Sequence, residues 1–303
     1  MARPICLVGI GKIAVDQHVP SIAASADWDL AATVSRSGTV DGVPAYTDFD
    51  RMLNERGDIA VVSLCLPPVP RYDYAARAIA AGRHVMLEKP PGATLAEVDA
   101  LGAMAKAAGV TLYTTWHSRM AEGVAPAKAW LADKVVKAAH ISWKEDVRRW
   151  HPGQDWVFEP GGMGVFDPGS NALSIMTEIL PMPVHLRTAE LFFPANRQTP
   201  IAAHLAWTGG VTGDFDWRQE GPQSWDISVE TTAGRLDLHD GGARLVIDGQ
   251  EVIAGPGAEY PALYARMADL VATGQSQVDV SPMLHVADAL TIGRRTEVEA
   301  FHF

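Results

Sequence analysis

Three short segments of the sequence carry residue types that could perform redox chemistry on a small polar molecule. They are Gly9-Ile10-Gly11-Lys12-Ile13-Ala14, Glu88-Lys89-Pro90 and a later segment that contains Asp167 and Asn171. A glycine turn can bind phosphate groups, an ammonium group can stabilise a developing negative charge, and a carboxylate can accept a proton. The three segments together predict a nucleotide-dependent enzyme.

The glycine segment has the pattern G-x-G-x-x-A and directly follows a short aliphatic run. The first glycine permits a tight turn, and the second lets the backbone approach a pyrophosphate. The small Ala14 lets the next helix pack closely, so that its N-terminus points at the phosphates. A tight loop without a ligand is the alternative, but the position between a predicted strand and helix favours dinucleotide binding by Gly9, Gly11, Lys12 and Ile13.

The end of the second predicted strand indicates which dinucleotide binds. An acidic residue there would hold the ribose 2′-hydroxyl of NAD, whereas this strand ends in Ser35-Arg36-Ser37. Arg36 can pair with a 2′-phosphate, and the hydroxyl of Ser35 can donate to it. We expect NADP to be preferred, with NAD as the other candidate cofactor. In the alternative interpretation, Arg36 is a solvated loop residue.

Residues 4–116 alternate between short aliphatic runs and segments with helical spacing. Continuous apolar character is typical of strands covered on both faces, as in a parallel sheet between helices. Thr94 and Glu97 form a capping box, and Gly82 and Gly109 suit helix C-termini. The pattern predicts a Rossmann-type, doubly wound α/β domain with strands near residues 5–10, 30–35, 59–66, 84–87 and 110–115.

After about residue 120 the pattern changes to strands joined by short turns. Asp248-Gly249 is a strong hairpin signal, and Asp167-Pro168 predicts a helix with Asp167 as its N-cap. Further helices are expected near 122–132, 260–272 and 283–294. We therefore expect a dinucleotide-binding domain over residues 1–120. Residues 121–303 would form a substrate-binding and oligomerisation domain of α+β type, with a large, mostly antiparallel open sheet.

The composition excludes several classes of function. The 303 residues include 25 Lys and Arg against 36 Asp and Glu, a net charge of −11, which argues against nucleic acid as a partner. The longest apolar stretch, residues 59–66, is far shorter than the ~20 residues that span a bilayer. Two cysteines make no disulfide framework, and the N-terminus reads as a strand rather than a signal peptide. We expect a reduced, cytoplasmic protein with no membrane partner.

These motifs resemble the glucose–fructose oxidoreductase and inositol dehydrogenase family, which carries E-K-P at the position of residues 88–90. The resemblance spans essentially the whole chain and implies the two-domain fold described above. Since ligands bind at the carboxyl ends of such strands, it adds Leu66, Pro67, Glu88 and Lys89 to the expected cofactor contacts. The family's G-G-G-x-x-x-D-x-x-x-H stretch corresponds to residues 161–171, where Asp167 is kept and Asn171 replaces the histidine.

Further segments resemble the bacterial aldose 1-dehydrogenases that act on D-galactose and L-arabinose. They are Trp116-His117-Ser118-Arg119, Trp143-Lys144-Glu145-Asp146 and residues 150–156, which begin Trp150-His151. The resemblance implies oxidation of an aldopyranose at C1 to the aldonolactone, linked to NADP or NAD. Asn171 argues against an Asp/His pair of the inositol dehydrogenase type.

Oxidation at C1 needs a proton acceptor and a positive group beside the developing alkoxide. Asp167 and Asn171 are four residues apart and share a helix face, so we expect them to act as acceptor and orienting group. Lys89 would lower the pKa of the C1 hydroxyl. The glycine run before Asp167, which would let backbone crowd a ligand, favours this role over a plain N-cap. In an alternative assignment Lys89 is the acceptor and Asp167 only orients.

The sugar itself is expected to contact residues that follow strands of both domains. Glu145 can accept from two hydroxyls, and Trp150 can supply a stacking wall. The full expected set is Lys89, His117, Glu145, Trp150, His151, Asp167 and Asn171. The histidine spacing predicts no metal site.

Two rival functions stay open. One is another polyol or aldose dehydrogenase of this family, and the other is a non-catalytic NADP-sensing regulator. A regulator accounts less well for the presence of Lys89, Asp167 and Asn171, since a protein that only senses NADP needs no proton acceptor. The broad antiparallel sheet suggests that the chain forms a homodimer through the C-terminal domain.

Overall fold

The aliphatic runs of the N-terminal third form one parallel sheet. In a computed structural model that describes residues 2–303, six strands have the order β3-β2-β1-β4-β5-β6. Strands β4 and β5 bury all of their apolar residues, as expected of strands covered on both faces, and β1 and β2 bury theirs toward their carboxyl ends. The strands are β1 (Arg3–Val8), β2 (Trp28–Val34), β3 (Ala45–Tyr46), β4 (Val61–Leu64), β5 (His84–Leu87) and β6 (Leu112–Thr114).

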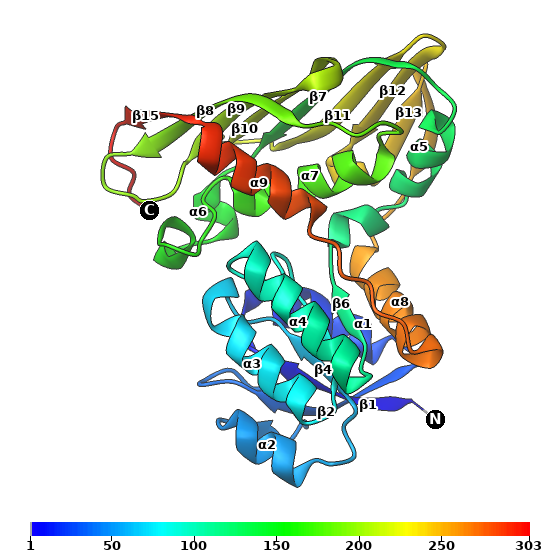
Figure 1. Cartoon of the computed structure of the whole chain (residues 1–303), viewed down its shortest axis with the longest axis vertical. Coiled ribbons are helices and arrows are strands. Elements are labelled where there is room, and N and C mark those ends of the chain that lie inside the picture. Colours follow the sequence, from blue (N-terminus) through cyan, green and yellow to red (C-terminus); the bar gives the residue numbers. More distant parts are fainter. Residues whose placement is uncertain (1) are drawn as a thin grey trace. The chain divides into compact units, whose positions relative to one another are not determined.

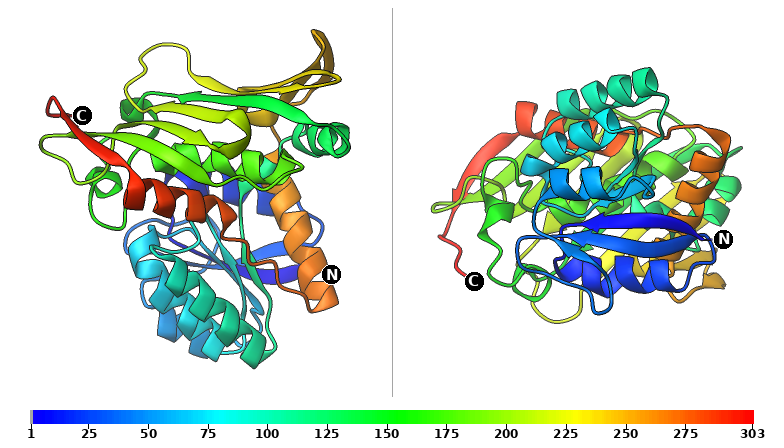
Figure 2. Two further views of the ribbon diagram at one scale, coloured as in Figure 1. Left: turned by 45° about the horizontal axis from the view of Figure 1, so that its top comes forward. Right: turned by 90° about the horizontal axis from the view of Figure 1, so that it is seen from below.

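Helices cover both faces of this sheet, with α2, α3 and α4 on one face and α1 on the other (Figure 2). The predicted signals at the helix ends are present. Thr94 and Glu97 complete the capping box of α4, and Gly109 ends that helix in the left-handed conformation. The doubly wound α/β prediction is therefore confirmed for the helices α1 (Val19–Ala23), α2 (Phe49–Glu55), α3 (Pro68–Ala80) and α4 (Leu95–Ala108).

A second sheet follows, also as predicted. Among residues 2–303 it has nine strands in the order β14-β13-β12-β11-β7-β10-β9-β8-β15, and most neighbours are antiparallel. Only β7–β10 and β8–β15 pair in parallel. The strands are β7 (Val136–Lys144), β8 (Leu186–Pro194), β9 (Ala202–Trp207), β10 (Val211–Asp216), β11 (Ser224–Thr231), β12 (Gly234–His239), β13 (Arg244–Ile247), β14 (Gln250–Ala254) and β15 (Arg294–Val298).

One face of the second sheet carries α5 (Val124–Leu131), α7 (Phe166–Ile179) and α9 (Ser281–Ile292) (Figures 1 and 2), while the short α6 (Val147–Trp150) follows β7. Side chains alternate accordingly: Ile141 and Phe215 are buried under the helices, whereas His140, Thr212 and His204 point to the uncovered face. That face is polar, and pairing of two copies through it stays a prediction.

The C-terminal helix α8 (Glu259–Thr273) belongs mainly with the first sheet. The chain divides into unit 1, Met1–His117 with Tyr260–Val280, and unit 2, Ser118–Glu259 with Ser281–Phe303. The sequence interpretation had placed all of residues 121–303 in the second domain. The physical reason for the difference is hydrogen bonding: the indole of Trp28 donates to the Tyr264 carbonyl oxygen at 2.9 Å, and the Tyr264 hydroxyl meets His18 Nδ1 at 2.7 Å.

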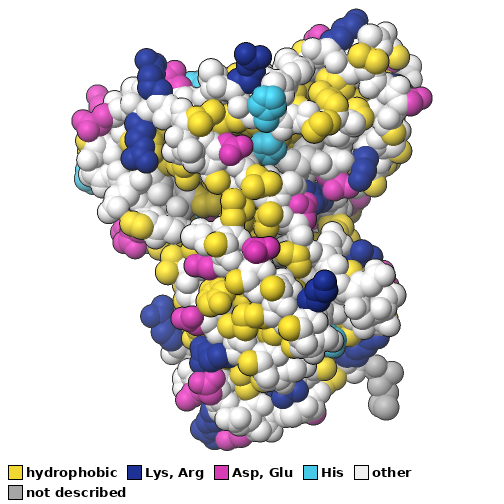
Figure 3. Space-filling view, viewed as in Figure 1, with side chains coloured by type: hydrophobic (Ala, Val, Ile, Leu, Met, Phe, Trp, Pro, Cys, Tyr) yellow, Lys and Arg dark blue, Asp and Glu magenta, His cyan; other side chains and the backbone are white. Residues whose placement is uncertain are grey.

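The surface drawn in Figure 3 mixes basic, acidic and apolar side chains without a large field of one sign. Within residues 2–303, every helix is too short or too polar to cross a membrane.

Candidate active site

The glycine turn after β1 has the geometry of a phosphate-binding turn. Gly9 has φ +89°, and a Cβ there would lie 2.9 Å from the Leu66 nitrogen, so only glycine fits. A Cβ on Gly11 would meet no atom within 4 Å, which leaves room for a ligand beside the backbone. The helix that follows opens with a π-helical turn over Ala14–His18, and Ala14 is fully buried. This turn fits a dinucleotide pyrophosphate.

The next two residues of the turn lie on its exposed side. Lys12 forms an ion pair with Asp16, and Ile13 is 40% exposed although it is a large apolar residue. Single exposed apolar residues are common on protein surfaces, so the cofactor contact of Ile13 stays a prediction.

At the end of β2, the chain turns at Ser35, whose hydroxyl accepts from the backbone nitrogen of Gly38 at 3.1 Å. Arg36 is exposed, and no partner for its guanidinium group occurs among residues 2–303. The cation is therefore accessible, which fits both a contact to an anionic ligand and a solvated loop residue, so its role toward the 2′-phosphate stays a prediction.

The segments that follow β4 and β5 are held together by Arg71 of α3. This buried guanidinium group donates hydrogen bonds to the carbonyl oxygens of Leu66, Glu88 and Pro90. It thereby holds the backbone on both sides of Lys89, which is half-buried. Pro67 is exposed at the start of α3.

Glu88 is a buried carboxylate, 4% exposed. The Tyr260 hydroxyl donates to its Oε1 at 2.7 Å, and His18 Nε2 lies 3.5 Å from the same oxygen. At that length the His18 contact is an ion pair rather than a well-formed hydrogen bond. Burial raises the pKa of the Glu88 carboxyl, but His18, with smaller contributions from His117 and Lys89, outweighs it and lowers the pKa to about 2.

The opposite shift occurs at His18. Burial lowers the pKa of its imidazole, but the neighbouring Cys65, Tyr264 and Glu88 outweigh it and hold the pKa well above the usual value. The two groups therefore form a buried ion pair next to Lys89. His117, which follows β6, completes this region by stacking on Tyr260 with 5.3 Å between ring centroids. Unit 1 thus brings together Glu88, Lys89 and His117.

In unit 2, Glu145 directly follows β7 and is 5% exposed. Its Oε1 accepts from the indole of Trp217 at 3.0 Å, and its Oε2 accepts from the indole of Trp225 at 2.8 Å. Trp150 lies 5.5 Å from the Trp225 ring, and its own buried indole nitrogen has no hydrogen-bond partner within the described residues. A buried donor without a partner suits a polar ligand.

Asp167 and Asn171 both lie on α7, and Asp167 is 4% exposed. The Asn171 amide has no hydrogen-bond partner in residues 2–303 and can therefore bind a ligand. His151, also predicted here, approaches Asp167, with Nε2 at 3.2 Å from Oδ2. Unit 2 therefore brings three of its predicted site residues together.

Two expectations about Asp167 were wrong. The helix begins at Phe166, so Asp167 is its second residue and not its N-cap. The preceding glycines do not serve a ligand, since a Cβ on Gly164 would lie 2.2 Å from the Pro200 carbonyl oxygen and one on Gly162 2.3 Å from that of Trp156. The run is glycine-rich because the chain packs against itself.

Sequence reasoning missed the residues that hold these groups in place. His18, Arg71 and Tyr260 support Glu88 and Lys89, whereas Trp217 and Trp225 bind Glu145. A buried arginine needs partners for its charge, but the sequence around Arg71 does not show that its side chain is buried. Sequence analysis therefore had no signal for the role of Arg71.

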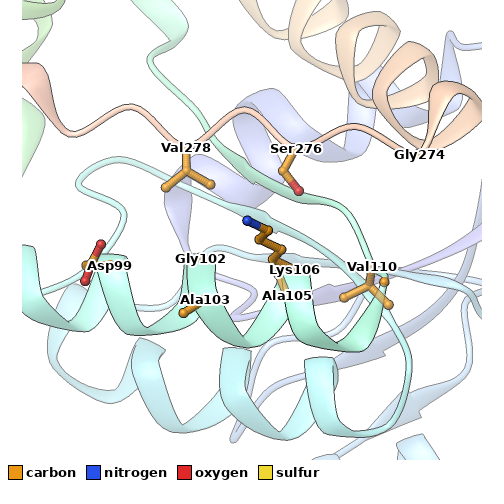
Figure 4. Close-up of a pocket in the computed structure, with 10 residues that line it drawn as sticks. Asp99, Gly102, Ala103, Ala105, Lys106, Val110, Gly274, Ser276 and Val278 are labelled. Carbon is orange, nitrogen blue, oxygen red and sulfur yellow. The ribbon is translucent and has the colours of Figure 1, made fainter.

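A hollow of about 650 Å³ in unit 1 lies along α4, lined by Lys106, Ser276 and Val278 among others (Figure 4). None of the predicted site residues lines it, so it is not the candidate site.

Comparisons with known proteins agree with this geometry. Residues 4–115 match GFO_IDH_MocA, the oxidoreductase family with an NAD-binding Rossmann fold. The chain is also 39% identical to galactose 1-dehydrogenase from Pseudomonas fluorescens, over 98% of its own length and 97% of that enzyme's. The chain belongs to this family.

Solved structures of this oxidoreductase family extend the comparison. The crystal structure of D-galactose-1-dehydrogenase from Rhizobium etli has a TM-score of 0.95 and 53% identity, and the match covers 100% of this chain and 99% of that one. KijD10, a 3-ketoreductase from Actinomadura kijaniata, has a TM-score of 0.84 at 19% identity, covering 98% of this chain and 100% of its own, and shares the fold alone. The family resemblance predicted from the E-K-P motif is confirmed.

The ion pair of His18 and Glu88 predicts how stability depends on pH. Because the folded-state pKa of His18 is raised, its contribution is complete below the unfolded value near 6.5 and is lost as the pH rises through the folded value. His18→Gln should therefore lower the free energy of unfolding by about 3 kcal/mol at pH 6, and by less at alkaline pH. Urea denaturation followed by circular dichroism at several pH values measures both.

The matched control is His239→Gln, which removes a more exposed partner of Asp226 and should cost less than about 1 kcal/mol. A His18→Gln difference that stays constant or grows with pH would contradict the buried ion pair.

Arg71→Lys tests the clamp on the cofactor segments. Lysine keeps the charge but cannot reproduce the planar fork that binds three carbonyl oxygens. We expect the dissociation constants of NADP and NAD to rise roughly tenfold, as isothermal titration calorimetry would measure, because about one charged hydrogen bond is lost. Arg83→Lys, which alters bonds to the carbonyl oxygens of Leu53 and Gly57, should leave both constants unchanged. Unaltered binding by Arg71→Lys would show that the clamp is dispensable.

Proposed function

We propose that this chain oxidises D-galactose at C1 to the aldonolactone, with L-arabinose as a second substrate and NADP preferred over NAD. The full-length similarity to two galactose 1-dehydrogenases is the observation that carries the proposal. The two sugars share their configuration from C1 to C4, so one binding site can accept both.

The residues of this chain divide the chemistry between them. When bound, the nicotinamide ring supplies the hydride acceptor. We assign Lys89 and Asp167 to the same C1 hydroxyl, where the ammonium group stabilises the developing alkoxide and the carboxylate accepts the proton. Asn171, one helical turn after Asp167, orients the hydroxyl with its amide. An assignment in which Lys89 accepts the proton is the alternative.

Glu145 is suited to bind sugar hydroxyls. Two indole donors fix its carboxylate, and a carboxylate offers about four lone-pair sites, which lets it accept from hydroxyls as well. Both indole donors are neutral, and hydrogen bonds from sugar hydroxyls to a carboxylate are charge-assisted. We assign Trp150 to the same sugar, as a stacking surface and a donor. His117 is the corresponding donor from unit 1.

A panel of sugars tests the proposal directly. We expect reduction of NADP, followed by absorbance, with D-galactose and L-arabinose but not with methyl β-D-galactopyranoside, whose C1 oxygen carries no proton. Since one 25% identical relative is a D-glucoside 3-dehydrogenase, turnover of the methyl glycoside would place the reaction at another carbon. Turnover of myo-inositol alone would indicate a polyol dehydrogenase, and silence toward every sugar would favour a regulator.

Arg36→Ala tests the choice of cofactor. Loss of a charged hydrogen bond worth about 1.5–3 kcal/mol should raise the KM for NADP roughly 10- to 100-fold, while the KM for NAD changes little. Steady-state kinetics with each cofactor measures the difference. Arg51→Ala removes another exposed arginine, one paired with Glu55, and should change neither KM. An equal loss with both cofactors would remove Arg36 from 2′-phosphate recognition.

A further inference from the structure

The carboxylate of Asp167 faces a histidine from another part of unit 2. The distance from Asp167 Oδ2 to His151 Nε2 is 3.2 Å, and the two side chains are 6% and 21% exposed. The family's motif has a histidine four residues after the aspartate, where this chain has Asn171. His151 approaches the same carboxylate from the segment that follows α6.

Gln154 determines which ring nitrogen of His151 carries a proton. The indole of Trp156 donates to Gln154 Oε1 at 3.1 Å. Since an indole N–H can only donate, the amide atom that it meets must be the oxygen. The same oxygen lies 3.2 Å from His151 Nδ1. It carries no hydrogen, so Nδ1 must be the donor in that contact.

With one proton on Nδ1, a second proton must lie in the contact between His151 Nε2 and the Asp167 carboxyl group. In a neutral ring protonated on Nδ1, Nε2 presents a lone pair, and a carboxylate oxygen presents another. Two acceptors do not approach to 3.2 Å without a proton between them. The contact therefore holds either an imidazolium beside a carboxylate or a neutral ring beside a carboxylic acid.

We propose that His151 shares this proton with Asp167 and keeps the buried carboxyl in its ionised, proton-accepting form. The inference rests on the proposed role of Asp167 in taking the sugar's proton. Burial by itself favours the neutral acid, which cannot accept a proton, and an imidazolium 3.2 Å away opposes that effect. His151 is a positioning residue in this scheme, because it acts through Asp167.

The protons and electrons balance in a simple way. The C1–H bond breaks and its electron pair leaves as hydride to the nicotinamide, while the O–H bond breaks and its proton passes to the Asp167 carboxylate. The sugar becomes the lactone, and the pair then holds two protons. His151 is the more exposed member, so the extra proton can return to water from its ring.

The other charged groups on the surrounding elements are engaged in contacts of their own. Asp155 pairs with Arg197, and Arg148 pairs with Asp146. Glu145 accepts from the indoles of Trp217 and Trp225, and the Trp217 ring also contacts His151. Lys89, assigned to the same hydroxyl, is unchanged in the variants below and cannot produce a difference between them.

His151→Gln tests the pair, since glutamine can still donate to Asp167 but cannot carry charge. We expect the acidic limb of the kcat/KM profile for D-galactose to move up by at least one pH unit. Relative to wild type, activity should then be about tenfold or more lower on that limb than on the alkaline side. A uniform loss at every pH would indicate a structural role and overturn the proposal.

The control is His239→Gln, which alters a histidine–aspartate pair on the uncovered face of the sheet and should leave the acidic limb in place. Asp167→Asn separates the two hypotheses. If that variant keeps its rate and profile, the proposed role of Asp167 fails. If Asp167→Asn is inactive and His151→Gln keeps the wild-type limb, only the shared proton is refuted.

A measurement without substrate tests the same geometry. Nitrogen-15 NMR of labelled histidine, assigned with His151→Gln, should show the His151 proton on Nδ1 between pH 6 and 9. The pH at which the His151 ring titrates should differ between Asp167→Asn and the wild-type protein. A neutral His151 protonated on Nε2 alone would overturn the inference.

Discussion

An ionised carboxylate buried inside unit 1 is the constraint on which the cofactor-binding region depends. Glu88 has left water, so its charge must be met by groups brought from elsewhere in the chain. They come from the helix after the glycine turn, as His18, and from α8, as Tyr260. These contacts tie the phosphate turn, the segment that carries Lys89 and a C-terminal helix into one arrangement. A buried ion pair contributes little net stability, but breaking it is costly, so it specifies which packing is allowed.

Unit 2 holds two buried carboxylates in two different ways. Glu145 accepts from two neutral indoles, which fix the orientation of its carboxylate. Asp167 faces an imidazole, a group that titrates near neutral pH. Only the second arrangement pairs the carboxylate with a partner that can itself take up and release a proton near neutral pH. The partners therefore distinguish two carboxylates at similar burial, in line with the binding role that we propose for Glu145 and the proton transfer that we propose for Asp167.

The sequence was sufficient for most of the fold, because the relevant signals are local. Continuous apolar runs marked the parallel strands, the capping box at Thr94 marked the start of α4, and alternation marked the second sheet. Two strands were not predicted. Strand β3 has only two residues, and β15 (Arg294–Val298) is a polar strand at the edge of its sheet, so neither has a clear apolar pattern. The N-cap at Asp167 failed because Pro168 suggested a helix starting there. The helix starts earlier, and proline is tolerated at its third residue, where the missing N–H has no intrahelical partner.

The supporting residues could not be predicted, because their roles depend on distant partners. His18 lies in a π-helical turn, so an ordinary helical period gives the wrong direction for its side chain. Arg71 and Tyr260 bind groups 17 and 172 residues away. The same reasoning applies to the replaced histidine of the family's motif. The sequence places Asn171, an expected orienting group, where the family's motif has a histidine, and His151 lies beside Asp167 from a different segment. The proton sharing that we propose needs an imidazole within reach of one carboxylate oxygen, and that condition restricts a distance without specifying a place in the sequence.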